Sequence, residues 1–190
     1  IIQKSINTMN YPTNLTDNQW SYVEKNLPNV SRKRKHCLRD VVNAILYLVK
    51  TGCQWRMLPS DFPAWNSVYY YFSNWKRDGT IEFIMRMLHK AVREQAGRDP
   101  EPSVCIIDSR SVKTSHHTDK VKGIDGNKRV KGRKEHIAVD TLGFPIGMAV
   151  HEANVCDAVG AELVFSALDG KSERLRTILA DGGYRGERVR

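Results

Sequence analysis

The sequence predicts a chain of two parts, a helical domain over residues 9–97 and an α/β domain over residues 103–190. Apolar residues recur at helical spacing through the first part. In the second part, the short apolar runs 104–107 and 177–180 have the length and composition of buried strands. Residues 98–102, which include two prolines, form the predicted linker between the two domains.

The composition is that of a folded, basic protein. Hydrophobic residues make up 41% of the 190 residues, and 30 Lys and Arg against 21 Asp and Glu give a formal net charge of +9. A positive surplus of this size favours a polyanionic partner such as nucleic acid. A solvated basic surface would have the same composition, so charge alone leaves both interpretations open.

Export and membrane signals are missing from the sequence. No apolar run approaches the about 20 residues that a membrane span needs. The four cysteines are widely separated, which indicates free thiols rather than disulfides, and a zinc site drawing on His116 and His117 is the less favoured alternative. We therefore expect a soluble, cytoplasmic protein without membrane contact, and we expect residues 1–8, which precede Met9, to be an upstream extension.

Four helices are predicted in the first part of the chain. They cover residues 17–27, 38–51, 65–76 and 81–92. Thr16 can cap the first helix, with the Gln19 side chain returning a hydrogen bond to the cap residue. Gly52 is placed to end the second helix, whose apolar residues follow a helical stripe.

This helical part suits a helix-turn-helix-like DNA-binding domain, because its helices are short, its breaks are tight and its third helix is basic and aromatic. An ordinary helical bundle shows the same periodicity, but the basic run at residues 32–36 favours DNA binding. The predicted DNA contacts in this part are Arg32, Lys33, Arg34, Lys35, Tyr70, Tyr71, Asn74 and Arg77. Trp55, Trp65 and Trp75 are interpreted as core residues.

In the second part, the predicted order is strand, hairpin, crossover helix and strand. The strands are predicted over residues 103–107, 136–139, 145–150 and 176–180. Asp157 is predicted to cap the helix. The apolar face of that helix carries Ala161, Val164, Phe165 and Leu168. The ribonuclease H-like fold has this order of elements, with its fourth strand lying parallel beside the first.

Two aspartates follow the first and last of these strands, Asp108 after residues 104–107 and Asp181 after residues 177–180. If the two strands are neighbours, the carboxylates lie together at the edge of the sheet, where open α/β folds hold ligands. Carboxylates so close raise each other's pKa unless cations lie between them, and Mg²⁺ suits that role. The alternative is that each aspartate only caps the turn after its strand.

A glycine-containing segment from Ser115 to Arg133 shows no apolar periodicity and is predicted to be a loop. Beside a pair of acidic metal ligands, such a basic loop would follow a phosphate backbone, whereas a solvated flexible loop is the plainer alternative. The DNA contacts predicted here and at the adjoining position are Lys128, Arg129, Lys131, Arg133 and Lys134.

Several motifs occur in an order that is specific. In the first part they are residues 11–20 (YPTNLTDNQW), 51–59 (TGCQWRMLP) and 65–75. In the second part they are residues 107–113 (IDSRSVK), 131–143 and 180–186 (ADGGYRG). Together they resemble the bacterial insertion-sequence transposases of the IS5 group (IS4/IS5-like), the second set resembling the DDE catalytic domain. The resemblance extends from Met9 to the end of the chain.

The resemblance implies an enzyme that binds double-stranded DNA at the terminal inverted repeats of its element as a homodimer. Such an enzyme cuts there and joins the freed 3′ ends to target DNA. Two aspartates and a glutamate hold two Mg²⁺ ions in the family, and by position Asp108 and Asp181 would be the first two acids. The glutamate is expected on a helix beyond Arg190, because Glu187 lies too soon after Asp181, so the chain is expected to be a carboxy-terminally truncated transposase with a partial ribonuclease H-like domain.

Two other readings remain open at this stage. A truncated transposase without catalytic activity would still bind inverted-repeat DNA and hinder the full-length enzyme. Another ribonuclease H-like nuclease is the weaker option, because the first-part motifs resemble transposases. In either transposase reading, the protein is expected in the bacterial cytoplasm, associated with the nucleoid.

Overall fold

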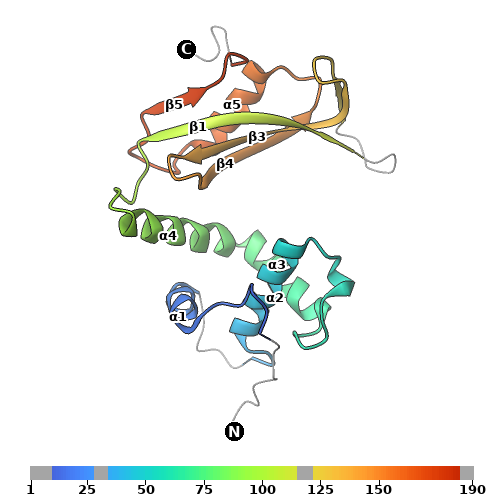
Figure 1. Cartoon of the computed structure of the whole chain (residues 1–190), viewed down its shortest axis with the longest axis vertical. Coiled ribbons are helices and arrows are strands. Elements are labelled where there is room, and N and C mark those ends of the chain that lie inside the picture. The colour runs from blue at the N-terminus through green and yellow to red at the C-terminus, as the bar shows by residue number, and fades with distance from the viewer. Residues whose placement is uncertain (1–9, 28–33, 115–121, 185–190) are drawn as a thin grey trace. The chain divides into compact units, whose positions relative to one another are not determined.

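The computed structural model describes residues 10–27, 34–114 and 122–184 (Figure 1). The chain divides into two compact units, Ile1–Leu88 and His89–Arg190, and each is described by itself. This division falls within a helix, whereas the sequence analysis placed a linker at residues 98–102. The predicted domain limits therefore stay a prediction.

The first unit is helical, as predicted. Its elements are α1 (Asp17–Asn26), α2 (Leu38–Thr51), a short 3₁₀ turn (Trp55–Met57), α3 (Trp65–Arg77) and the greater part of α4 (Thr80–Gln95). The capping box at α1 is confirmed, because Thr16 Oγ1 accepts from the Gln19 N–H at 3.3 Å while Gln19 Oε1 accepts from the Thr16 N–H at 2.9 Å. Gly52 ends α2 in the left-handed conformation at φ 68°.

Two small apolar clusters hold this unit together. Val23, Leu27 and Leu38 form one, and Trp75 packs against it; the other is built on Ala44, Phe62 and Val68, with Trp55 beside it. Trp55 and Trp75 therefore pack against the core as predicted. The prediction for Trp65 is wrong: it is the first residue of α3, its side chain is 37% exposed, and the Arg56 guanidinium lies over its ring.

The second unit contains a mixed five-stranded sheet. Its strands are β1 (Val104–Lys113), β2 (Gly123–Asp125), β3 (Val130–Asp140), β4 (Pro145–Glu152) and β5 (Thr177–Ala180). The strand order is β2-β3-β1-β5, with β4 also paired to β3. β1 runs antiparallel to β3 and parallel to β5, so the predicted neighbourhood of the first and last strands is confirmed.

Two strands are longer than predicted. β1 continues past Ile107 to Lys113, and β3 begins at Val130 instead of His136. The predicted loop over residues 115–133 is wrong for residues 123–125, which form β2, and for residues 130–133, which begin β3. Residues 126–129 form a turn, and residues 115–121 lie outside the described ranges. The extensions pair with each other through their backbones, up to Lys113 opposite Gly132. Their polar side chains hid this pairing from an analysis based on apolar periodicity.

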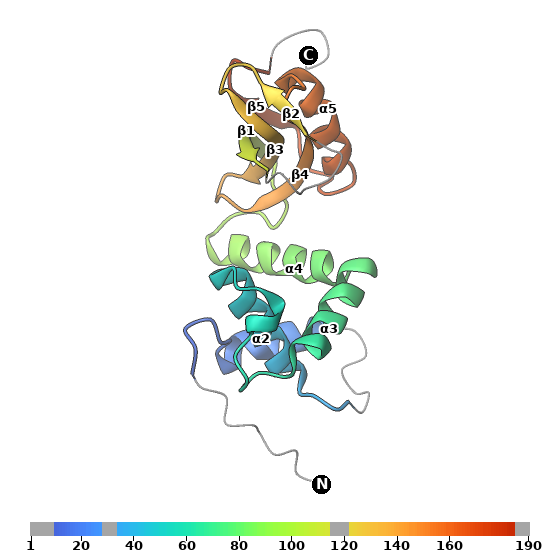
Figure 2. The same cartoon turned by 90° about the vertical axis from the view of Figure 1, so that its right-hand side faces the viewer.

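One helix, α5 (Asp157–Leu168), covers one face of the sheet (Figures 1 and 2). The core cluster beneath it consists of Cys105, Ile107, Ala138, Ala161, Val164, Leu168 and the ring of Tyr184. The burial of Ala161, Val164 and Leu168 confirms the predicted apolar face of α5. Asp157 was predicted to cap α5, and that prediction is wrong: Cys156 is the cap residue, and the Asp157 carboxylate pairs with Lys134 instead.

The opposite face of the sheet carries apolar side chains that are exposed, among them Ile106, Ile137 and Met148. All four cysteines are free thiols, as predicted, although Cys105 alone of them is fully buried. Within the described ranges, no helix is both long and apolar enough to cross a membrane.

Candidate active site

The two aspartates singled out in the sequence lie where two adjacent parallel strands meet, Asp108 within β1 and Asp181 directly after the last residue of β5. The prediction that Asp108 follows the end of its strand is therefore wrong, because β1 continues to Lys113. Ile107 of β1 pairs with Ala180 of β5, and Asp108 and Asp181 are the residues that follow this pair. Adjacent strands are about 4.8 Å apart, and side chains at paired positions of parallel strands point to the same face. Both aspartates are exposed. The fold therefore brings two solvent-accessible carboxylates together at one edge of the sheet.

Backbone amides orient both carboxylates. Asp108 Oδ1 accepts a hydrogen bond from the Ser109 N–H at 2.7 Å, and Asp181 Oδ1 accepts one from the Gly183 N–H at 2.9 Å. The turn after β5 is closed by a further bond, from the Tyr184 N–H to the Asp181 carbonyl at 3.2 Å. These bonds hold each carboxylate in a defined orientation.

These two carboxylates suit a hard divalent cation. Mg²⁺ is usually bound by one or two protein carboxylates, with water and substrate phosphate completing its coordination. The described ranges contain no group of three or more His, Cys, Asp and Glu side chains arranged to hold a metal. Glu187, His116 and His117 lie outside those ranges. The pair therefore has the ligand chemistry of a partial site for a divalent cation.

A third carboxylate lies behind this pair. Asp157, in the first turn of α5, accepts from Ser109 Oγ at 3.2 Å and from Lys134 Nζ at 3.1 Å, both at its Oδ1 atom. Its Oδ2 atom faces Gly183, where it lies 2.8 Å from the position that a Cβ atom would take. Asp181 Oδ1 lies 3.2 Å from the same point. Gly183 thus separates the carboxylates of Asp157 and Asp181, and a larger residue would push on both.

Asp157 belongs to a buried polar layer on the α5 side of the sheet. We use this name for Ser109, Ser111, Asp125, Lys134, His136, His151, Asp157 and Tyr184. Lys134 is the one lysine in this layer, which contains no arginine. Its Nζ atom lies 4.0 Å from Asp125 Oδ2 and donates to the Val155 carbonyl at 3.0 Å. Its side chain is only 9% exposed, so this residue, predicted to contact DNA, is instead paired with carboxylates inside the domain.

Two histidines and a tyrosine complete the polar layer. His136 is fully buried, its Nδ1 atom lies 2.7 Å from the Tyr184 hydroxyl, and its ring centre is 4.8 Å from that of His151. The pKa of His136 is lowered to about 4, mainly by burial and to a smaller extent by the neighbouring His151. The ring is therefore neutral at pH 7. Burial likewise raises the pKa of Tyr184 to about 12. Gly160 of α5 packs directly over both imidazoles, where a Cβ atom would collide with them.

The basic residues predicted to contact DNA in this unit lie mostly on the turn between β2 and β3 and on the start of β3. Lys128, Arg129 and Lys131 are exposed and Arg133 is half-buried. Lys128 Nζ donates to the Ser109 carbonyl at 3.3 Å, which places this cation beside the residue that follows Asp108. The turn is held by Asp125, whose Oδ1 accepts from the Asn127 and Lys128 amides.

The basic and aromatic residues predicted to contact DNA in the first unit have different surroundings. Tyr70 is 64% exposed, whereas Tyr71 is half-buried and packs against Trp75, with ring centres 5.4 Å apart. Asn74 accepts a hydrogen bond from the exposed Arg77 at 2.5 Å. Lys35 is exposed and Arg34 half-buried, while Arg32 and Lys33 lie outside the described ranges.

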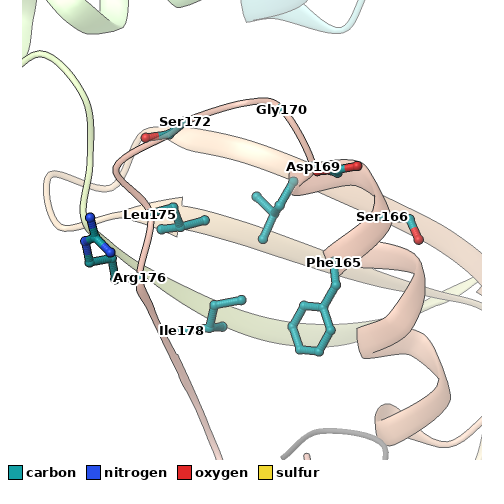
Figure 3. Close-up of a pocket in the computed structure, with 9 residues that line it drawn as sticks. Phe165, Ser166, Asp169, Gly170, Ser172, Leu175, Arg176 and Ile178 are labelled. Atoms are coloured by element: carbon teal, nitrogen blue, oxygen red, sulfur yellow. The ribbon is translucent and has the colours of Figure 1, made fainter.

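A groove of about 510 Å³ lies elsewhere in the second unit, between the end of α5 and the start of β5 (Figure 3). Phe165, Leu175 and Ile178 line it (Figure 3). Because Ile178 is near the start of β5 and Asp181 follows its end, the groove is separate from the paired aspartates.

The sequence analysis missed the polar layer. Ser109, His136 and Tyr184 were not singled out, and Asp157 and Lys134 were given other roles. One signal was present: Lys134, His136 and Ala138 alternate along β3, and Ala138 lies in the apolar core. Strand periodicity therefore places Lys134 and His136 on the buried face once β3 is known to extend that far.

Comparison with known families accounts for most of the chain. Residues 15–85 match the family model described as transposase of the IS4/5 family, and residues 99–190 match the family model of the transposase DDE domain. Neither curated proteins nor solved structures gave a match. The second match covers Asp108, Asp181 and the whole sheet, and it implies a ribonuclease H-like fold for that region. With both parts matched in this order, the chain belongs to the IS4/IS5 family of DDE transposases.

Proposed function

We propose that this transposase binds the terminal inverted repeats of its insertion sequence and takes part in metal-dependent cleavage and transfer of DNA strands. The observation that carries the proposal is the placement of Asp108 within β1 beside Asp181, which directly follows β5, in the region matching the DDE domain. Carboxylates that share divalent cations are the usual protein ligands in two-metal phosphoryl transfer.

Asp108 and Asp181 are the residues proposed to hold Mg²⁺. When bound there, Mg²⁺ activates the attacking water or 3′ hydroxyl and stabilises the leaving oxygen. The chain's own contribution is to fix the two carboxylates: the Ser109 amide orients Asp108, and the Gly183 amide orients Asp181. Orientation of this kind lowers the reorganisation needed when the phosphate arrives.

Cations near the site are proposed to attract the DNA backbone. Lys128 contacts the carbonyl of Ser109, and Arg129 and Lys131 are exposed close to it in the chain. Each phosphate neutralised by such a residue releases counterions, which makes affinity depend on salt. We place the further DNA contacts on α3, at Tyr70 and Arg77, and we expect a homodimer on inverted-repeat and target DNA.

The catalytic proposal is tested with a labelled duplex that carries the inverted repeat flanking the gene. A version of the protein that also carries the family's third acidic residue is incubated with the duplex and Mg²⁺ or Mn²⁺, and strand cleavage is measured. Asp108→Asn and Asp181→Asn should each abolish cleavage, because either change removes a charged ligand. Asp169→Asn, at the far end of α5, is the matched control and should cleave like the parent. Cleavage that survives in either of the first two variants would refute the metal assignment.

The binding proposal is tested separately by gel shift. Affinity for the same duplex should fall as salt rises, and the triple variant with Lys128, Arg129 and Lys131 changed to Ala should show weaker binding and a shallower salt dependence. Binding without cleavage by the parent chain would favour the alternative role, a DNA-binding protein that hinders an active transposase. Absence of binding even at low salt would remove both roles.

A further inference from the structure

The most connected side chain behind the paired aspartates is Asp157. Its Oδ1 atom joins two strands to the start of α5, because it accepts from Ser109 of β1 and from Lys134 of β3. Ser109 directly follows Asp108 within β1, so this contact holds β1 at the position of the first candidate ligand.

The other oxygen of Asp157 faces the second candidate ligand. Asp157 Oδ2 and Asp181 Oδ1 approach the same point beside Gly183, the first to 2.8 Å and the second to 3.2 Å. Gly183 is therefore held between the two carboxylates, and its amide also donates to Asp181. The turn that carries Asp181 thus has Asp157 as a wall on one side.

The same turn is anchored a second time at Tyr184. This side chain is 7% exposed, and its hydroxyl meets the fully buried His136. His136 stands opposite Ser109 in the pairing of β1 with β3. Both Asp157 and Tyr184 consequently connect the turn after β5 to the same stretch of β1 and β3. Asp157 does so by its close approach to Gly183, and Tyr184 does so through its hydroxyl.

We propose that Asp157 is a positioning residue that fixes the turn carrying Asp181 beside the middle of β1, and so sets the spacing of the Asp108 and Asp181 carboxylates. The consequence for metal binding rests on the proposed function. Lys134 supports this role, because its Nζ lies 3.1 Å from Asp157 Oδ1 and holds that carboxylate at the start of α5. A neighbour that orients a metal ligand in this way typically changes metal affinity when it is removed.

The experiment uses the whole chain and two readouts. The first is hydrogen exchange of the Gly183 and Tyr184 amides, measured by NMR without metal. The second is the affinity for Mn²⁺, measured by the electron paramagnetic resonance of the free ion. Asp169→Ala is the matched control, since Asp169 is a carboxylate at the opposite end of α5 and is exposed.

Asp157→Ala should accelerate exchange at both amides and weaken Mn²⁺ binding about 10-fold, whereas the control should change neither. Asp157→Asn should lie between Asp157→Ala and the parent, because an amide oxygen still accepts from Ser109 and Lys134. Gly183→Ala addresses the same contact from the other side and decides the matter if Asp157→Ala does not fold. It should disturb the Tyr184 amide, since the added methyl meets Asp157.

Unchanged exchange in Asp157→Ala, or an equal change in the control, would overturn the positioning role. A parent chain that binds no Mn²⁺ would count against the proposed function alone, because the exchange measurement still decides whether Asp157 positions the turn.

Discussion

Two halves of one sheet face, both covered by α5, are built from opposite kinds of side chain. Toward the start of β1, Cys105 and Ile107 enter the apolar core; two and four residues further on, Ser109 and Ser111 enter the polar layer. Along β1, the side chains on this face change from apolar to polar between Ile107 and Ser109, the two neighbours of Asp108. Along β3, the change lies between Ala138 and His136, which pair with Ile107 and Ser109 respectively.

This difference shows in which part of the domain polar side chains are buried. An apolar core is stabilised by removing surface from water and needs no particular partner. Buried charges are tolerated only when they are paired and hydrogen-bonded, and the pairing of Lys134 with Asp157 meets that condition. The polar layer is found at the end of the sheet that carries the candidate ligands. Hydrogen bonds in the polar layer are directional, so they orient the side chains that they join more strictly than apolar contacts do.

The comparison is tested most severely at Lys134, the buried cation of the polar layer. Lys134→Met should lower the free energy of unfolding by about 4 kcal/mol, because Asp157 and Asp125 lose the charge that compensates them. Urea unfolding at pH 7 measures the change. Lys131→Met, an exposed lysine on the same strand, should stay within about 0.5 kcal/mol of the parent. Equal effects would mean that the buried pair contributes no special stability.

The apolar core gives the next largest effect. Leu168→Ala should cost about 3 kcal/mol, since it removes a buried side chain and leaves a cavity beside Gly147. Leu163, on the exposed side of the same helix, is 47% accessible, and Leu163→Ala should cost little. Thermal and urea unfolding of both variants compare them. A loss at position 163 as large as that at 168 would show that α5 is covered on both sides.

The polar layer should also be recognisable by its response to pH. The pKa of His136 is lowered to about 4 in the folded protein, against about 6.5 in an unfolded chain. The unfolded state therefore binds a proton first as the pH falls, and stability is lost from about pH 6.5 downward until the folded-state pKa is reached. We expect a loss of about 2 kcal/mol between pH 6.5 and pH 5.

His136→Gln is the variant that isolates this pH dependence. Glutamine cannot titrate, so the slope of unfolding free energy against pH between 6.5 and 5 should flatten, whatever the stability at pH 7. Urea titrations at several pH values measure the slope. If the parent and the variant show the same slope, the pH dependence belongs to other groups and His136 is not held neutral by burial.

Much of the fold could be predicted because it depends on local patterns. The capping box at Thr16, the glycine that ends α2 and the buried face of α5 each follow from a few neighbouring residues. The neighbourhood of β1 and β5 followed from the order of the elements. That order also placed Asp108 beside Asp181, so the central pair of the candidate site was accessible from sequence.

The polar layer could not be predicted, because each of its members is explained by a distant partner. Lys134 meets Asp157 across 23 positions, and His136 meets Tyr184 across 48. Viewed locally, Lys134 continues a basic run and Asp157 begins a helix, which is why the first was assigned to DNA and the second to a cap. Polar residues also concealed the extensions of β1 and β3, since a strand with serines and lysines lacks an apolar signal.

The smallest expected effect comes from a single hydroxyl in the polar layer. Ser111 Oγ donates to Asp125 Oδ2 at 2.5 Å, and this bond is the main cause of the lowered pKa of Asp125. Ser111→Ala should cost about 1.5 kcal/mol at pH 7 and should raise the pKa of Asp125. Because a lowered carboxyl pKa contributes stability that disappears as the pH falls, the difference in unfolding free energy between parent and variant should shrink below pH 4.

Ser166→Ala, which removes an exposed hydroxyl bonded to the Glu162 carbonyl, is the control and should show no such convergence. If the difference in unfolding free energy stays constant at low pH, Ser111 stabilises the domain through packing and not through its hydrogen bond to the Asp125 carboxylate.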